Sequence, residues 1–221
     1  MPLPPVALRW GGSRYHSDEE YLRSARKVAR RVIDECGLTR DSRLLDIGCG
    51  QGRLLRGVIG ELGCVGRYLG LDVHEPSVEW LRSQVNVGFA EFRLLHFRND
   101  RYNPSIRERE LPDLGERFEA VVLISVFSHM RLDDISTYLR FIRKSMAENA
   151  RAFLTAFVED DVQAEEENPV GYIAPSKGPL HRVRLNRQHF EKMVREAGLQ
   201  VSVFRYAIHD GQSVYVLTQS S

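Results

Sequence analysis

Three glycines at alternate positions, Gly48, Gly50 and Gly52, are the residues whose spacing most directly indicates chemistry. An apolar run at residues 44–47 precedes them, and a helical pattern opens at Arg53. The run is too short for a helix and is typical of a buried parallel strand. A strand that turns through glycines into a helix exposes main-chain N–H groups and lets a ligand approach closely. The stretch predicts a nucleotide-type binding turn; a tight turn without a ligand is the alternative.

Two neighbouring residues discriminate between nucleotides. The dinucleotide fingerprint G-x-G-x-x-G needs its third glycine at position 53, where this chain has Arg53. Asp46 lies at the strand end, two residues before Gly48. Its carboxylate would repel a pyrophosphate and attract an ammonium group. Both observations favour S-adenosylmethionine over NAD.

At this stretch the chain resembles the class I S-adenosylmethionine-dependent methyltransferases, whose first motif reads acidic-x-G-x-G-x-G. Cys49 fills the small position between the first two glycines. The resemblance implies S-adenosyl-L-methionine as cofactor, bound at Asp46 and the turn. It also implies an α/β fold, with a doubly wound, mostly parallel sheet, helices on both faces and a C-terminal antiparallel hairpin (the Rossmann-like methyltransferase fold). Residues 199–206 and 213–218 are the two apolar segments expected to form that hairpin.

A second acidic residue, Asp72, ends the next predicted strand, residues 67–73. It follows Gly52 by 20 residues, after one helix and one strand. A right-handed βαβ unit places such a carboxylate at the carboxyl end of the strand beside the glycine turn. We therefore expect Asp72 to bind the ribose hydroxyls, with Val73 beside it.

The third predicted strand, residues 91–97, departs from the family pattern. In the resembled family its end carries an aspartate that binds the adenine amino group, with an apolar neighbour against the ring. The matching positions here are His96 and Phe97. A neutral imidazole can still accept from an amino group through one nitrogen, so both are candidate adenine contacts.

The fourth predicted strand, residues 118–124, ends in Ser125 and Val126, which we expect to border the cofactor. His129 then lies near the methyl group. A hydroxyl or amine acceptor needs a base to take its proton, and the pKa range of histidine suits that task. His129 is therefore the candidate catalytic base; a local backbone hydrogen bond at the start of a helix is the alternative.

Two flanking segments are expected to close over the site within one methyltransferase domain, residues 1–221. Residues 1–38 form an arm and a helix, and Tyr15 and His16 of the arm could reach the site; a surface position in a loose arm is the alternative. Residues 159–180 combine a run of acids with several prolines and glycines, and long irregular insertions of this kind are usually functional or mobile. We interpret this segment as a substrate lid, with a disordered surface excursion as the alternative.

Composition excludes several other classes of function. The 31 basic and 30 acidic residues leave a net charge of +1, which gives no electrostatic case for a nucleic-acid partner. The three cysteines form no C-x-x-C pair, and no metal-ligand array is recognisable. With neither a signal-peptide pattern nor a membrane span, we expect a cytoplasmic protein and no membrane partner.

The methyl acceptor is expected to be a small molecule with a hydroxyl or amine group. After the fourth strand the chain has Ser125-Val126-Phe127-Ser128 rather than an Asn/Asp-Pro-Pro-aromatic motif. That difference counts against amino-group methylation of nucleic acids. Two alternatives remain open: a cofactor-binding protein without transfer activity, and an NAD-type nucleotide enzyme.

Overall fold

The computed structural model describes residues 1–173 and 175–220. The described residues form a nine-stranded sheet in the order β3-β2-β1-β4-β5-β7-β6, and β9 pairs with both β5 and β8. The strands are β1 (Arg43–Ile47), β2 (Arg67–Asp72), β3 (Ala90–Leu94), β4 (Phe118–Leu123), β5 (Met146–Glu159), β6 (Glu165–Glu167), β7 (Val183–Asn186), β8 (Leu199–His209) and β9 (Gln212–Gln219). The helices are α1 (Asp18–Cys36), α2 (Arg53–Leu62), α3 (Glu75–Gln84), α4 (Leu132–Ser145) and α5 (Arg187–Glu196), with short 3-10 helices η1 (Val6–Leu8), η2 (Ser13–His16) and η3 (Phe127–His129).

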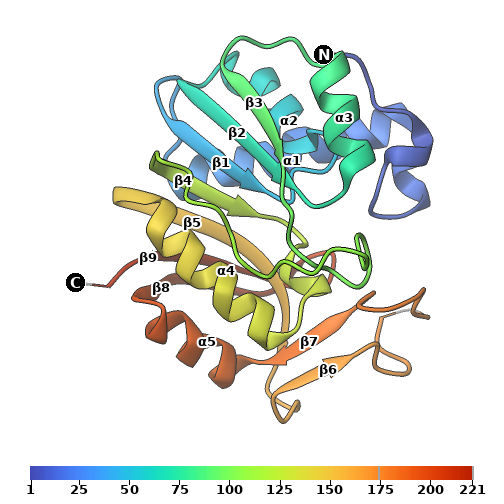
Figure 1. Ribbon diagram of the computed structural model, residues 1–221, viewed down its shortest axis with the longest axis vertical. Helices are drawn as coiled ribbons and strands as arrows, with labels where there is room; N and C mark the ends of the chain where they lie inside the picture. Colours follow the sequence, from blue (N-terminus) through green and yellow to red (C-terminus); the bar gives the residue numbers. More distant parts are fainter. Residues whose placement is uncertain (174, 221) are drawn as a thin grey trace.

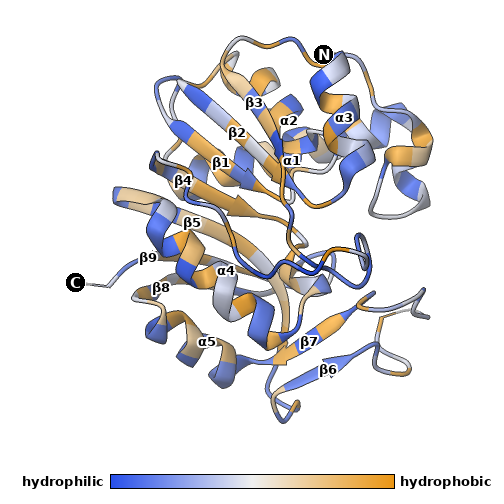
Figure 2. Ribbon diagram, in the orientation of Figure 1, coloured by the Kyte–Doolittle hydropathy of each residue, from blue (hydrophilic) through white to orange (hydrophobic). Residues whose placement is uncertain are grey.

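Helices cover both faces of this sheet. In Figure 1, α4 and α5 lie in front of the strands, and α1 and α2 lie behind them. Two hydrophobic cores result, one on the side of α4 and α5 and the other on the side of α1, α2 and α3. Figure 2 shows that apolar residues dominate β4 and β5, which are covered on both faces. The predicted doubly wound fold is confirmed.

The C-terminal strands are antiparallel, as expected. β8 pairs antiparallel with β9, and β9 pairs antiparallel with β5, for example Phe153 opposite Val216. Strands β1 to β5 pair in parallel in the order 3-2-1-4-5. The parallel part places the carboxyl ends of β1, β2 and β4 together at one edge, where a ligand site is expected.

Part of the predicted lid is ordered as strand. β6 and β7 form an antiparallel pair in which Glu166 lies opposite Arg184, and β7 continues the sheet beside β5. The three consecutive glutamates of β6 show no apolar alternation, so no sequence pattern predicts this strand (coloured hydrophilic in Figure 2). Position 174, inside the predicted lid, lies outside the described residues.

Packing between α1 and α2 depends on a glycine. A Cβ at Gly57 would lie 2.1 Å from the main-chain oxygen of Ala25 in α1. We expect Gly57→Ala to lower the free energy of unfolding by about 1–3 kcal/mol, because the backbone of α1 must shift. Gly60 lies on the exposed side of the same helix with nothing within 4 Å, so Gly60→Ala should raise stability by about 0.5–1 kcal/mol. Urea denaturation of both variants tests the contrast, and equal effects would contradict it.

None of the helices in the described part of the chain is both long and apolar enough to cross a membrane.

Candidate active site

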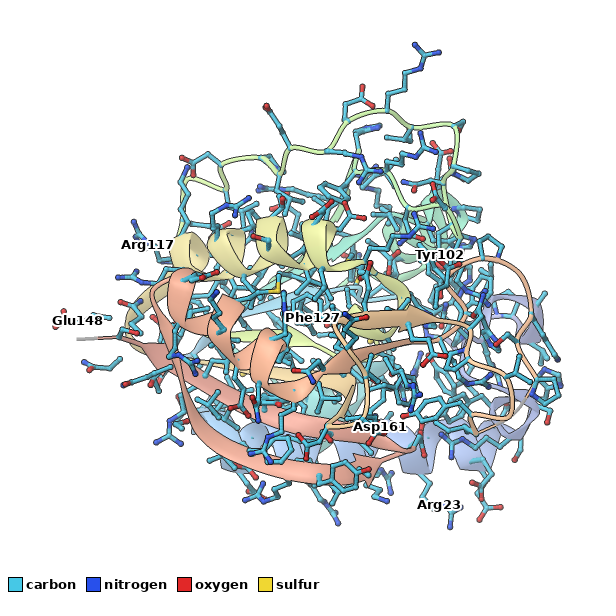
Figure 3. All side chains as sticks on the ribbon, turned by 90° about the horizontal axis from the view of Figure 1, so that it is seen from below. Arg23, Tyr102, Arg117, Phe127, Glu148 and Asp161 are labelled. Atoms are coloured by element: carbon cyan, nitrogen blue, oxygen red, sulfur yellow. The ribbon has the colours of Figure 1, made fainter. Side chains whose placement is uncertain are left out.

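A cavity of about 690 Å³ opens at the carboxyl edge of the parallel strands. Its floor comes from the ends of β1, β2, β4 and β5. Its walls come from the N-terminal arm, the loop after β3, Ile173 and side chains between residues 175 and 182. In Figure 1 the arm (blue) and the β6–β7 region (orange) lie on the same side of the molecule as these strand ends. Figure 3 shows Tyr102, which belongs to the cavity wall, at one end of the molecule. Arg117 and Glu148, which lie near the amino ends of β4 and β5, are at the opposite end.

The glycine turn closes tightly over the end of β1. Gly48, Gly50 and Gly52 all have left-handed φ angles, of 75°, 51° and 73°. A Cβ at Gly48 would lie 2.4 Å from Cγ2 of Val126, so only glycine lets the turn approach the end of β4 this closely. The main-chain N–H groups of Gly48 and Cys49 donate to the carbonyl of Leu71, at 2.7 and 3.0 Å. The turn therefore has the close backbone approach that its spacing predicts.

Asp72 is held against this turn by the backbone. Its carboxylate accepts from the N–H of Gly50 at 2.7 Å and from the N–H of His74 at 2.8 Å. The residue is 8% exposed and lines the cavity. Burial raises the pKa of Asp72 above its usual value. Both oxygens keep acceptor capacity for a ligand diol.

Asp46 is buried more deeply, at the end of β1. The hydroxyl of Tyr68 donates to its Oδ2 at 2.5 Å, and Asp46 is 3% exposed. Burial raises the pKa of Asp46 to about 7, which the Tyr68 hydrogen bond partly opposes. A ligand cation at this position would favour the ionised carboxylate.

This pKa leads to a pH dependence of ligand binding. A cationic ligand needs Asp46 ionised, so the affinity for S-adenosylhomocysteine should rise as the pH rises through about 7. Below that pH the affinity should fall about tenfold per pH unit. In this range, ligand binding should release the proton of Asp46 to the buffer. Calorimetry in two buffers of different ionisation enthalpy measures that proton. Asp46→Asn should abolish the dependence. An affinity that does not change between pH 6 and pH 8 would place the cation elsewhere.

His129 lies in η3, just after β4. Its Nδ1 donates to the carbonyl of Leu180 at 2.9 Å, 51 residues further along the chain. With the proton on Nδ1, Nε2 is the basic nitrogen. Burial lowers the pKa of His129 to about 4, so the ring is neutral at pH 7. The imidazole thus bonds to the distant lid and not to a local backbone group at the helix start.

Ser125 occupies a strained position at the end of β4, which the sequence did not indicate. Its φ is 58°, a left-handed value for a residue other than glycine. Its N–H donates to Thr155 Oγ1, Thr155 donates to Gln212 Oε1, and Gln212 Nε2 donates back to Ser125 Oγ, each at 2.8 Å. This closed ring fixes the Ser125 hydroxyl beside the cavity. The ring does not use the proton of the Ser125 hydroxyl.

The structure does not bring His96 and Phe97 into the cavity. β3 ends at Leu94, three residues earlier than predicted, and the chain then turns so that Leu95 lines the cavity. His96 is exposed. Phe97 is 1% exposed and packs edge-to-face on Tyr138, with ring centroids 5.0 Å apart. An adenine contact by either side chain does not fit this geometry.

Aromatic rings of Trp10, His74 and Tyr102 form one wall of the cavity. The Trp10 ring meets His74 and Tyr102 edge-to-face, with centroids 5.2 and 5.5 Å apart. Tyr102 in turn lies 5.8 Å from the His129 ring. Trp10 belongs to the irregular arm, where no periodic pattern could assign it to the site.

The arm also reaches the opposite side of the cavity, as expected for Tyr15. The Tyr15 hydroxyl accepts from Arg14 at 2.8 Å and from Arg53 at 3.1 Å. Arg14 forms an ion pair with Asp210 in the turn between β8 and β9. Among the described residues, no group of three or more His, Cys, Asp or Glu side chains is arranged to hold a metal ion.

The sheet, the glycine turn and the paired carboxylates define a nucleotide-cofactor enzyme of the doubly wound α/β class. The family described as a methyltransferase domain matches residues 21–202. This chain belongs to that family. The predicted methyltransferase class is confirmed.

Solved structures of the same fold cover almost the whole chain at low sequence identity. The glycopeptide N-methyltransferase MtfA complexed with sinefungin has a TM-score of 0.64 at 12% identity, covering 88% of this chain and 93% of its own. SAM-bound CalS10, an amino pentose methyltransferase from Micromonospora echinaspora, has 0.62 at 14%, covering 90% and 92%. The [4+2]-cyclase SpnF has 0.63 at 15%, covering 90% and 82%. At these identities the likeness concerns the fold.

Proposed function

We propose that this protein transfers the methyl group of S-adenosyl-L-methionine to a hydroxyl or amine of a small-molecule acceptor. The observation that carries the proposal is the cavity in which Asp46, the glycine turn and Asp72 meet. Its volume, about 690 Å³, lies within the usual range of small-molecule and cofactor sites. All 221 residues act as one domain, since a single sheet runs through the described elements.

The cofactor fits the donor set of this cavity. Asp72 binds the ribose hydroxyls, and Asp46 attracts the methionine ammonium group. The main chain of the glycine turn is open to the ligand at Gly50, which lines the cavity and, apart from its chain neighbours, has no residue within 4 Å of its Cβ position. The other residues proposed to contact the cofactor are Cys49, Gly50, Gly52, Val73, Ser125 and Val126. His96 and Phe97 are not among them.

The protein's own residues position the acceptor and take its proton. The sulfonium supplies an already activated methyl group, so alignment and exclusion of water are the main tasks of the site. His129 serves as the base through Nε2, because Nδ1 donates to Leu180. That bond also fixes the ring to residues 159–180, the lid, so lid closure and base orientation are linked.

Calorimetric titration with S-adenosylhomocysteine, with NADH in parallel, tests the cofactor. We expect micromolar affinity for the first and none for the second; the reverse would support the NAD-type alternative. A screen of hydroxy and amino metabolites with S-adenosylmethionine, read by mass spectrometry, then tests transfer. The same fold carries the [4+2]-cyclase SpnF. Tight cofactor binding with no methylated product would therefore favour a protein that does not transfer methyl groups.

A further inference from the structure

Basic side chains gather in the part of the cavity around His129. Arg101 from the loop after β3 lines it together with Lys177, His181 and Arg182. The acids that line the cavity are Asp46, Asp72 and Asp210. The first two belong to the proposed cofactor site, and Asp210 is paired with Arg14. This part of the cavity therefore has a surplus of positive charge.

The segment from Glu159 to Arg182 supplies Lys177, His181 and Arg182, and its acidic side chains lie apart from these basic ones. It contains six acids between residues 159 and 167, and none of them lines the cavity. Five of the six have bonding partners outside the cavity lining or in the main chain: Glu159 bonds to the hydroxyls of Tyr172 and Tyr206, Asp161 and Glu166 to Arg184, Glu165 to the N–H of Leu132, and Glu167 to Arg131 and the N–H of Leu180. The acidic side chains of this segment therefore do not line the cavity, whereas Lys177, His181 and Arg182 do.

Arg101 is anchored so that its charge stays at the cavity. Its Nη1 donates to the carbonyls of Lys177, at 2.8 Å, and Pro179, at 3.3 Å. Within the described ranges, no carboxylate lies within ion-pair distance of Arg101 or Lys177, and the buried Nε of Arg101 has no hydrogen-bond partner. Arg101 and Lys177 both line the cavity and both act on the charge of His181, so the two cations share one region of the cavity. A bound anion would offset their mutual repulsion there.

His181 contributes a neutral hydrogen-bond donor to the cluster of Arg101, Lys177 and Arg182. Its Nδ1 accepts from the main-chain N–H of Lys177 at 2.9 Å, which puts the ring proton on Nε2. Burial and the charges of Arg182, Arg101 and Lys177 lower the pKa of His181, so the ring does not add to the repulsion. Together these side chains offer donors that suit an oxyanion.

We propose that the methyl acceptor carries an anionic group, a carboxylate or a phosphate ester, which binds between Arg101 and Lys177. The inference rests on the proposed function, since it names the class of acceptor that the same cavity takes. Another cation of the cavity lining, Arg53, lies close enough to Asp46 to act on its charge and so belongs to the proposed cofactor end of the cavity. Arg101 and His181 act instead on His129, the proposed base. The anion therefore holds the acceptor beside that base.

Ligand-observed NMR with three matched probes tests this site: benzoate, phenyl phosphate and neutral benzamide, each with and without saturating S-adenosylhomocysteine. We expect at least one anion to bind about tenfold more tightly than benzamide, and the comparison of benzoate with phenyl phosphate identifies the preferred group. Lys177→Gln should weaken anion binding several-fold and Lys177→Glu should abolish it, because the side chain of Lys177 makes no ion pair in the described structure. Lys192→Gln, which removes an exposed lysine on α5, is the matched control.

Equal binding of benzamide and both anions, no detectable binding of either anion, or anion binding that survives Lys177→Glu would overturn the inference. Thermal unfolding confirms that each variant is folded. Failure of the proposed function has a different signature. If S-adenosylhomocysteine does not bind but the anions still distinguish Lys177→Glu from the wild type, the anion site stands and the cofactor is wrong.

Discussion

Asp72→Asn is expected to weaken binding of S-adenosylhomocysteine by about 1–3 kcal/mol, a loss of roughly ten- to a hundredfold in affinity. The buried carboxylate gives the cofactor two charge-assisted hydrogen bonds to the ribose diol. It is already oriented by the N–H groups of Gly50 and His74, so little reorganisation accompanies binding. An amide in its place keeps the shape but lacks the charge and one of the two acceptor oxygens. Titration calorimetry at pH 8 measures the loss.

Stability separates a binding role from a structural one. Because burial raises the folded-state pKa of Asp72, the folded protein binds this proton more tightly than the unfolded chain does. The ionised group therefore destabilises the fold as pH rises above the unfolded value. Asp72→Asn removes this charge but turns its NH2 group toward the N–H of Gly50 or His74 and loses one hydrogen bond, so thermal unfolding at pH 8 must show a folded variant before affinities are compared. Asp41→Asn, at an exposed acid between α1 and β1, is the matched control. Unchanged affinity in the Asp72 variant would exclude Asp72 from the ribose site.

The parallel strands and the glycine turn were predictable because short-range patterns encode them. The buried strand β1 has a short apolar run, Leu44, Leu45 and Ile47, broken only by Asp46. Gly48 is required locally by its φ and by the approach of Val126. The position of Asp72 follows from the right-handed βαβ connection, which fixes which strand end lies beside the turn. These residues therefore share one edge for reasons visible in the sequence.

Other parts of the site depend on contacts that no local pattern reports. The ring that holds Ser125 joins β4, β5 and β9, and Gln212 lies 87 residues from its partner. Trp10 reaches Tyr102 from an irregular arm. The family resemblance places His96 at the cavity end of the third strand, but β3 ends at Leu94 and the side chain that lines the cavity is Leu95. Long-range pairing and strand termination decide these positions, and one sequence constrains neither.

His129→Ala is expected to lower turnover of the identified acceptor by about 10²- to 10⁴-fold, the usual contribution of a positioned base, while cofactor affinity stays unchanged. The imidazole is neutral at pH 7 because burial lowers its pKa to about 4, so the base should be fully available across the neutral range. The fall of kcat/KM at low pH should accordingly report the protonation of Asp46, near pH 7 in the free enzyme. The fall of kcat over the same pH range should be smaller, because bound cofactor keeps Asp46 ionised.

Two variants distinguish the base from a merely structural lid contact. His129→Gln can still donate to the carbonyl of Leu180 but cannot accept a proton at neutral pH, so it should stay as slow as His129→Ala. His189→Ala removes an exposed histidine of α5 outside the cavity and should leave turnover intact. If His129→Gln restores wild-type turnover, the Leu180 hydrogen bond is the important feature and the base is another group. Loss of cofactor affinity together with turnover in His129→Ala would place the ring in the cofactor site.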